Sequence, residues 1–183
     1  MSNQYEVDIN KALTLLGAYL ERKELQREIV VGGGAAITLL GHARFSGTRD
    51  IDIVGSKLDK ELKNGAHFVA EELGLLPNWL NESATAFNDR YPEGWIKRIK
   101  LVFESENLIV HAVCREDMLY SKVCSELDRG FDYDDIVTLL PSEDELVELK
   151  KLSKTMKSNT GDIFPEFEID ILFDRLEGDL GHD

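Results

Sequence analysis

The chain has little of what marks secreted, membrane-spanning or disulfide-stabilised proteins. Its 183 residues include only 2 cysteines and 4 prolines. No apolar run approaches the ~18 residues that a membrane span needs. The first ten residues, MSNQYEVDIN, contain neither the basic nor the apolar region of a secretory signal. Cys114 and Cys124 form no metal-binding motif, so we expect buried, reduced thiols in a cytoplasmic protein with no membrane partner.

Basic residues are also scarce. There are 21 Lys and Arg against 35 Asp and Glu, which gives a net charge of −14. A surface of this sign repels a phosphate backbone at long range, so indiscriminate binding of nucleic acid is excluded. A specific RNA or nucleotide substrate is still compatible with the composition if local basic groups or a divalent cation offset the charge. A basic protein partner would also suit it.

What is present indicates one ordinary core, since 43% of the residues are apolar. Helical spacing of apolar residues predicts helices, and short apolar runs bounded by turn residues predict strands. We expect an α+β fold, with a mixed core over residues 1–115 and a helical part over 116–183 packed on it. The predicted helices are 9–23, 35–40, 59–73, 116–128, 133–140, 143–157 and 165–177, and the predicted strands are 28–32, 51–54, 99–104 and 108–113. Residues 76–95 read mostly as loop with short turns, and Gly178 as the end of the last helix.

The stretch VVGGGAAI, residues 30–37, predicts a strand that turns sharply beside a phosphate site. One hypothesis is a dinucleotide such as FAD or NAD, whose folds use G-x-G-x-x-G after a strand. Here the third glycine position is Ile37, which would obstruct close packing of helix on strand. The other hypothesis is a nucleotide-transferring protein, which combines a glycine turn with carboxylates that hold magnesium.

The stretch TRDIDIV, residues 48–54, supports the second hypothesis. On a strand, residues i and i+2 point to the same face, about 6–7 Å apart along the backbone. Asp50 and Asp52 would therefore present two carboxylates on one side, with Ile51 and Ile53 facing the core. Carboxylates at this spacing can share Mg²⁺, whereas without a cation they repel each other. The simpler interpretation is a half-exposed strand whose acids only face water.

These residues together resemble the nucleotidyltransferase superfamily, which includes DNA polymerase β and the aminoglycoside nucleotidyltransferases. Its signature is an apolar residue, Gly-Gly or Gly-Ser, about a dozen residues, and then D-x-D on a strand. Within it, the chain is similar to small bacterial proteins related to the AbiEii abortive-infection toxin. The motifs that carry this likeness are Gly33-Gly34-Ala35-Ala36, Gly41, Arg44, Thr48-Arg49-Asp50-Ile51-Asp52, Glu116–Lys122 and Arg129–Ile136.

The resemblance implies roles for the first group of residues. Asp50 and Asp52 would bind Mg²⁺, and the backbone of Gly33 and Gly34 would approach the phosphates of a nucleoside triphosphate. The Thr48 hydroxyl would donate to the terminal phosphate. Arg44 or Arg49 would pair with phosphate oxygens, unless they only solubilise a loop.

A second group lies in the predicted helical part. Lys122 would reach a phosphate, or else pair with Glu126 one turn away. Asp132 and Asp135 would orient Lys122 or act as the base for an acceptor hydroxyl, although Asp132 also suits a helix cap.

One departure from the pattern concerns a third carboxylate, which several active branches carry on a later strand. The corresponding strand, residues 108–113, has His111 and no acid. The leading hypothesis is therefore an enzyme that transfers a nucleoside monophosphate to a protein, tRNA or small-molecule hydroxyl, in a toxin–antitoxin or phage-defence pair. The alternative is a catalytically inactive, partner-binding antitoxin of the same fold.

Overall fold

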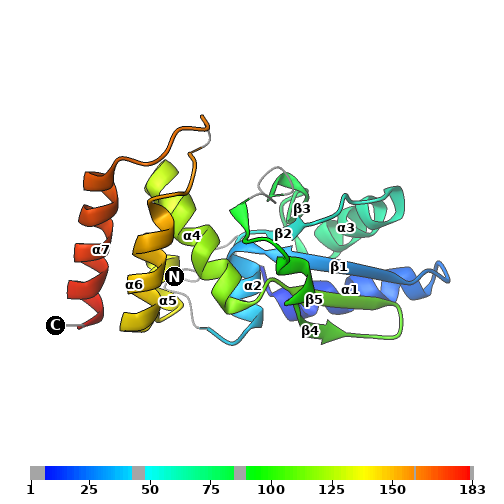
Figure 1. The fold of residues 1–183 in the computed structure, drawn as a ribbon. Coiled ribbons are helices and arrows are strands. Elements are labelled where there is room, and N and C mark those ends of the chain that lie inside the picture. Colours follow the sequence, from blue (N-terminus) through cyan, green and yellow to red (C-terminus); the bar gives the residue numbers. More distant parts are fainter. Residues whose placement is uncertain (1–6, 43–47, 85–89, 159, 182–183) are drawn as a thin grey trace. The chain divides into compact units, whose positions relative to one another are not determined.

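The computed structural model describes residues 7–42, 48–84, 90–158 and 160–181. The chain forms two compact units. The α+β unit comprises Met1–Asp89 and Glu93–Cys114, and the helical unit comprises Arg90–Pro92 and Arg115–Asp183. Figure 1 shows strands in the first unit and helices in the second. The predicted fold class, a small mixed sheet with flanking helices followed by a helical part, is confirmed.

The α+β unit contains three helices and a five-stranded sheet in the order β3-β2-β1-β5-β4. Strand β1 is central, antiparallel to β2 and parallel to β5. An antiparallel β1–β2 pair is incompatible with the parallel βαβ unit of a dinucleotide fold, so that hypothesis is wrong. The elements are α1 (Ile9–Glu21), β1 (Arg27–Gly32), α2 (Gly33–Leu39), β2 (Ile51–Val54), α3 (Lys60–Leu73), β3 (Leu80–Asn81), β4 (Lys100–Glu104) and β5 (Leu108–Ala112).

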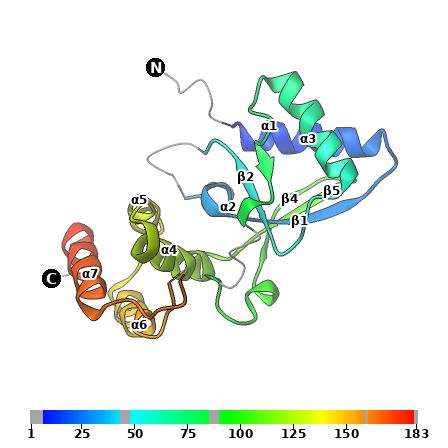
Figure 2. The same cartoon turned by 90° about the horizontal axis from the view of Figure 1, so that it is seen from above.

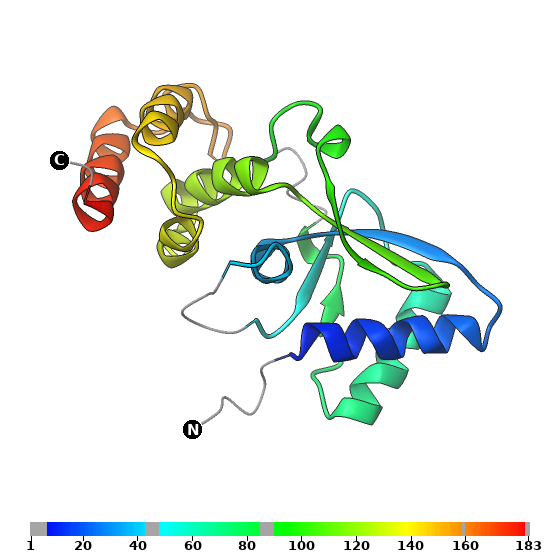
Figure 3. The ribbon, with the colours of Figure 1, turned by 90° about the horizontal axis from the view of Figure 1, so that it is seen from below.

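Helices α1 and α3 lie side by side against one face of this sheet (Figures 2 and 3). A Cβ added to Gly17 of α1 would lie 2.8 Å from Ser105 Oγ and in ordinary contact, at 3.8 Å, with the Leu108 Cβ of β5, so α1 packs directly on this strand. The ring of Tyr19 contacts that of Phe68 in α3, with centroids 5.6 Å apart. Apolar side chains of α1 and of the facing strand residues thus form the core of this unit.

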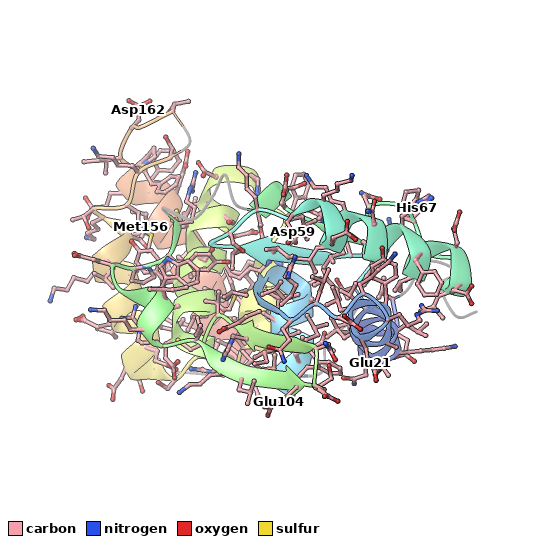
Figure 4. The ribbon with its side chains drawn as sticks, turned by 90° about the vertical axis from the view of Figure 1, so that its right-hand side faces the viewer. Glu21, Asp59, His67, Glu104, Met156 and Asp162 are labelled. Carbon is pink, nitrogen blue, oxygen red and sulfur yellow. The ribbon has the colours of Figure 1, made fainter. Side chains whose placement is uncertain are left out.

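The limits of α3 follow from its sequence. Asp59 caps it by accepting a hydrogen bond from the Leu62 amide, and Gly74 ends it in the left-handed conformation. Figure 4 labels Asp59 at the start of this helix and His67 further along it.

The helical unit consists of α4 (Arg115–Arg129), α5 (Tyr133–Thr138), α6 (Glu143–Ser153) and α7 (Glu166–Leu180). Ser142 and Glu145 form a capping box, so α6 begins where the sequence predicts. Two helix ends differ from the prediction by three or more residues. Helix α6 stops at Ser153 instead of 157, and Lys157 pairs as a bridge with Ile163. Helix α7 continues through Gly178 to Gly181, whose φ of +71° provides the C-cap.

The other differences are small. Leu80 and Asn81, which lie in the predicted loop of residues 76–95, form the two-residue strand β3. Cys114 and Cys124 are buried and form no disulfide, as expected. Within the described ranges, no helix has both the length and the apolar character required to cross a membrane.

Candidate functional site

The two faces of the sheet determine which way the acidic pair points. Leu108 packs against α1, and Ala112 lies on the same face four residues along β5. Ala112 is in register with Val31, which is in register with Ile53. Ile51 and Ile53 therefore face the helix-covered side, where both are fully buried. Asp52 alternates with them and lies on the opposite face, where it is half-buried.

Asp50 joins Asp52 on this second face through a residue of β3. Asn81 is in register with Asp52, so the two side chains share a face. The Asn81 amide nitrogen donates to Asp50 Oδ2 at 3.5 Å. The backbone N–H of Ser83 donates to Asn81 Oδ1, which orients the amide so that its nitrogen faces Asp50. Asp50, Asp52 and Asn81 thus form a polar group at the edge formed by β2 and β3.

The glycine bend lies directly against this group. Gly32 is in register with Asp52. Gly33 has a φ of +60°, and a Cβ added to it would lie 2.9 Å from Asp52 Oδ2. That distance is shorter than van der Waals contact, so only glycine leaves room for the carboxylate in this position. The sequence motifs GGG and DID, although separated in the chain, therefore meet in the fold.

The remaining predicted residues of the α+β unit differ in their contacts. The Thr48 side chain is buried, and its hydroxyl donates to the Asp50 carbonyl at 2.7 Å. Its donor thus holds the backbone that leads into β2, and a role for Thr48 in binding phosphate stays a prediction. Arg49 is exposed beside Asp50, and Gly34 is the second residue of α2. Arg44 lies outside the described residues.

His111 occupies the strand on which a third acid was expected. It alternates with Ala112 and so lies on the same face as Asp52, two strands away. Its Nδ1 lies 3.2 Å from Glu28 Oε1 without a well-aligned hydrogen bond. The position thus holds a histidine–glutamate contact at the sheet face.

In the helical unit, Lys122 lies at the centre of a buried ion-pair cluster. Its Nζ is 2.5 Å from Asp132 Oδ1 and 2.7 Å from Asp135 Oδ2, and the Lys122 side chain is only 12% exposed. Arg129 adds a second cation to Asp132 at 2.7 Å. Glu126 does not pair with Lys122 but accepts a hydrogen bond from the Asp132 amide at 2.7 Å.

These contacts separate the roles that the sequence left open for this cluster. Asp132 precedes α5 but makes no side-chain capping bond there. Both aspartates instead contact the Lys122 ammonium, so the geometry matches an orienting role. A role for Lys122 in binding phosphate stays a prediction.

Sequence reasoning missed Asn81. A two-residue strand shows no periodicity, and its asparagine resembles many others in a polar loop. Among the described residues, no group of three or more His, Cys, Asp and Glu side chains is arranged to hold a metal ion. The candidate metal ligands are therefore the two carboxylates of Asp50 and Asp52.

Comparison with known proteins agrees with the superfamily that these motifs suggested. The sequence model of a family described as nucleotidyltransferase of unknown function (DUF6036) matches residues 7–174. The chain therefore belongs to this family of nucleotidyltransferases. The match spans both the α+β unit and most of the helical unit. No curated protein and no solved structure matches the chain significantly.

Proposed function

We propose that the protein transfers a nucleoside monophosphate from a nucleoside triphosphate to a hydroxyl group, with Mg²⁺ held by Asp50 and Asp52. The observation that carries this proposal is the meeting of the Gly33 bend with the Asp52 carboxylate on the face that Asp50 shares. Membership of a nucleotidyltransferase family supports it.

The donor set fits magnesium. Mg²⁺ prefers hard oxygen ligands and is commonly held by one or two carboxylates, with substrate phosphates and water completing its shell. Two carboxylates at the sheet edge match that requirement, and a third protein ligand is not needed. Bound there, the ion would offset the negative charge on the phosphates as pyrophosphate leaves.

The chain's own groups would supply binding and orientation. Gly32 caps α2 and has no side chain, so no N-cap side chain occupies the first-turn amides of Gly33 and Gly34. These amides would bind phosphate oxygens, and Arg49 would contribute a nearby positive charge. Thr48 and Asn81 would hold the backbone and the carboxylate of Asp50 in place.

The proposed reaction is a substitution at phosphorus. The acceptor hydroxyl oxygen forms a bond to the α-phosphorus, the bond to the bridging oxygen of pyrophosphate breaks, and the hydroxyl proton passes to a base. We propose a protein, tRNA or small-molecule hydroxyl as acceptor, and a toxin–antitoxin or phage-defence setting in a bacterial cytoplasm. The likeness of the motifs to AbiEii-related proteins supports this setting.

Binding of a nucleotide tests the site first. Titration with each of the four nucleoside triphosphates and Mg²⁺ should show binding for at least one of them. The double variant Asp50→Asn with Asp52→Asn should weaken that binding at least about a hundredfold, since it removes both proposed ligands. The double variant Glu71→Gln with Glu72→Gln is the matched control, because it changes net charge equally at exposed positions of α3. Equal binding by the wild type and the Asp variant would overturn the site.

A second candidate function is a partner-binding protein of the same fold without catalysis. Two observations favour it: β5 carries His111 and no acid, and the described residues offer no metal cluster of three side chains. Incubation with α-³²P-labelled triphosphates and tRNA or candidate acceptor proteins separates the two. Transfer of label that depends on Asp50 and Asp52 supports the enzyme, whereas nucleotide binding without transfer supports the inactive protein.

A further inference from the structure

A groove in the helical unit runs between α4 and α7. It has a volume of about 220 Å³ and is lined by Glu126, Leu127, Glu168, Ile171, Leu172 and Arg175. A second hollow of about 400 Å³ is also lined by Leu127 and Glu168, and on its other side by residues of the segment that precedes α7, among them Asp162, Ile163 and Phe164. Figure 4 shows Asp162, which lines this second hollow, at the outer tip of the loop that precedes α7. The two hollows share Leu127 and Glu168 in their linings and are together called here the α4–α7 groove.

Exposed apolar side chains line this groove or neighbour its lining residues along α7. Phe167 and Ile171 are 63% and 65% exposed, and Ile163 is 60% exposed. Phe167 and Ile171 are four residues apart, so they lie on the same side of α7 one turn from each other. Single exposed apolar residues are ordinary, but a row of them beside an apolar groove marks an interaction surface.

The charge around the groove is negative. Residues 90–92 and 115–183 hold 19 acidic and 9 basic residues, so the helical unit accounts for most of the net charge of the protein. Glu126 and Glu168 line the groove directly. Arg175 is the only cationic residue among those that line the groove. Its guanidinium stacks over the Tyr133 ring at 3.5 Å and lies 3.9 Å from Asp179, so its charge already interacts within the protein. Across the part of the chain that the structure describes, Glu168 forms no ion pair.

We propose that the α4–α7 groove binds a basic amphipathic helix of a partner protein. The apolar side of such a helix would cover Phe167, Ile171 and Leu127, and its lysines or arginines would face Glu126 and Glu168. Charge complementarity selects this occupant. A second copy of the chain would bring two strongly acidic units together, and an anionic lipid surface would be repelled in the same way. The inference does not depend on the proposed nucleotide chemistry.

The test uses the full-length protein and a fluorescent 18-residue helical peptide with leucines on one side and lysines on the other. Binding is followed by fluorescence anisotropy in 150 mM and 500 mM salt, with a second peptide in which glutamates replace the lysines. We expect the lysine peptide to bind, to weaken at the higher salt, and to bind at least tenfold more tightly than the glutamate peptide.

Two protein variants locate the binding. Phe167→Ser with Ile171→Ser should weaken binding of the lysine peptide at least about tenfold, because both side chains are exposed contact residues of the proposed surface. Val147→Ser is the matched control, since Val147 is 61% exposed on α6 and lies outside the groove. Circular dichroism checks that each variant is folded.

Three results would overturn the inference. The first is no binding of the lysine peptide, and the second is equal binding by the groove variant and by Val147→Ser. The third is a dimer in sedimentation analysis that Phe167→Ser with Ile171→Ser dissociates, which would assign the groove to a second copy of the chain.

Discussion

The α+β unit leaves Asp50 and Asp52 half-buried at a sheet edge, close to a glycine bend. The helical unit encloses Asp132 and Asp135 around Lys122, with the three side chains between 7% and 12% exposed. A pair of carboxylates that is open to solvent can bind a cation from outside, whereas an enclosed pair has already been neutralised by the protein. The comparison separates a half-buried acidic pair, which we propose binds a cation, from an enclosed cluster whose charges are paired within the protein.

The largest expected effect concerns the enclosed pair. Lys122→Met removes the cation from two buried carboxylates and should lower the free energy of unfolding of the helical unit by about 3–5 kcal/mol. Urea denaturation at pH 7 measures it. Lys151→Met, at a side chain that is 79% exposed, is the control and should change stability by less than about 0.5 kcal/mol. A loss below about 1 kcal/mol for Lys122→Met would show that the cluster is not a stabilising element.

That cluster also shows what the sequence leaves undetermined. Residues four apart on a helix can contact each other, so the spacing predicts Glu126 as a partner of Lys122. The actual partners, Asp132 and Asp135, lie at the start of α5. The resemblance of the motifs suggested them, but no local spacing does, because their contact with Lys122 depends on how α5 packs against α4. Asn81 was missed for a related reason, since its place beside Asp50 depends on the pairing of β3 with β2.

The site in the α+β unit was more predictable. The alternation of Ile51, Asp52 and Ile53 determines which residues are buried, because one face of the sheet must be covered. The turn at Gly33 needs a left-handed backbone conformation, which glycine adopts without a steric cost. The glycine in the sequence therefore predicts the turn. The sequence therefore predicts β1, α2 and β2 within one or two residues, together with the orientation of the acids. The unexpected use of the Thr48 hydroxyl depends on a loop whose conformation has no sequence period.

A second ion pair in the helical unit tests the same comparison through pH. The hydrogen bond from Arg115 lowers the pKa of Glu145 to about 2, and the Ser142 amide adds to the effect. Because this pKa lies below the usual 4.5, the contact stabilises fully above about pH 4.5 and is lost as the pH falls toward 2. Glu145→Gln should cost about 1–2 kcal/mol at pH 7, after allowance for solvent screening of a partly exposed pair.

Unfolding of Glu145→Gln in urea at pH 7 and pH 3 measures this dependence. Glutamine keeps the capping-box contact with Ser142, so the variant isolates the charge. Glu148→Gln, at an exposed residue of the same helix, is the control. A cost that does not shrink at pH 3 would mean that the pair stabilises through packing and not through charge.

A smaller effect on stability, but a large one on binding, is expected at Gly33. Gly33→Ala and Gly74→Ala place a Cβ at similar φ values of +60° and +66°, so each should cost about 1–2 kcal/mol through backbone strain. Only the Gly33 Cβ meets Asp52, since Gly74 has open space around it. Gly33→Ala alone should therefore weaken nucleotide binding with Mg²⁺, by at least about tenfold. Equal binding by the two variants would separate the glycine bend from the ligand site.

The smallest expected effect is the stability of Asp52→Asn without Mg²⁺, which should lie within about 0.5 kcal/mol of the wild type. Asp52 is half-buried and shares its face with Asp50, so removing its charge also removes a repulsion, and asparagine can still form hydrogen bonds. Asp132→Asn, the same change in the enclosed cluster, should cost about 2 kcal/mol or more because it removes a carboxylate charge from the buried Lys122 and the half-exposed Arg129. Urea denaturation of both variants compares the units directly. If Asp52→Asn were as costly as Asp132→Asn, the acid at the sheet edge would be a structural element. The contrast between the half-buried acids of the α+β unit and the enclosed cluster of the helical unit would then fail.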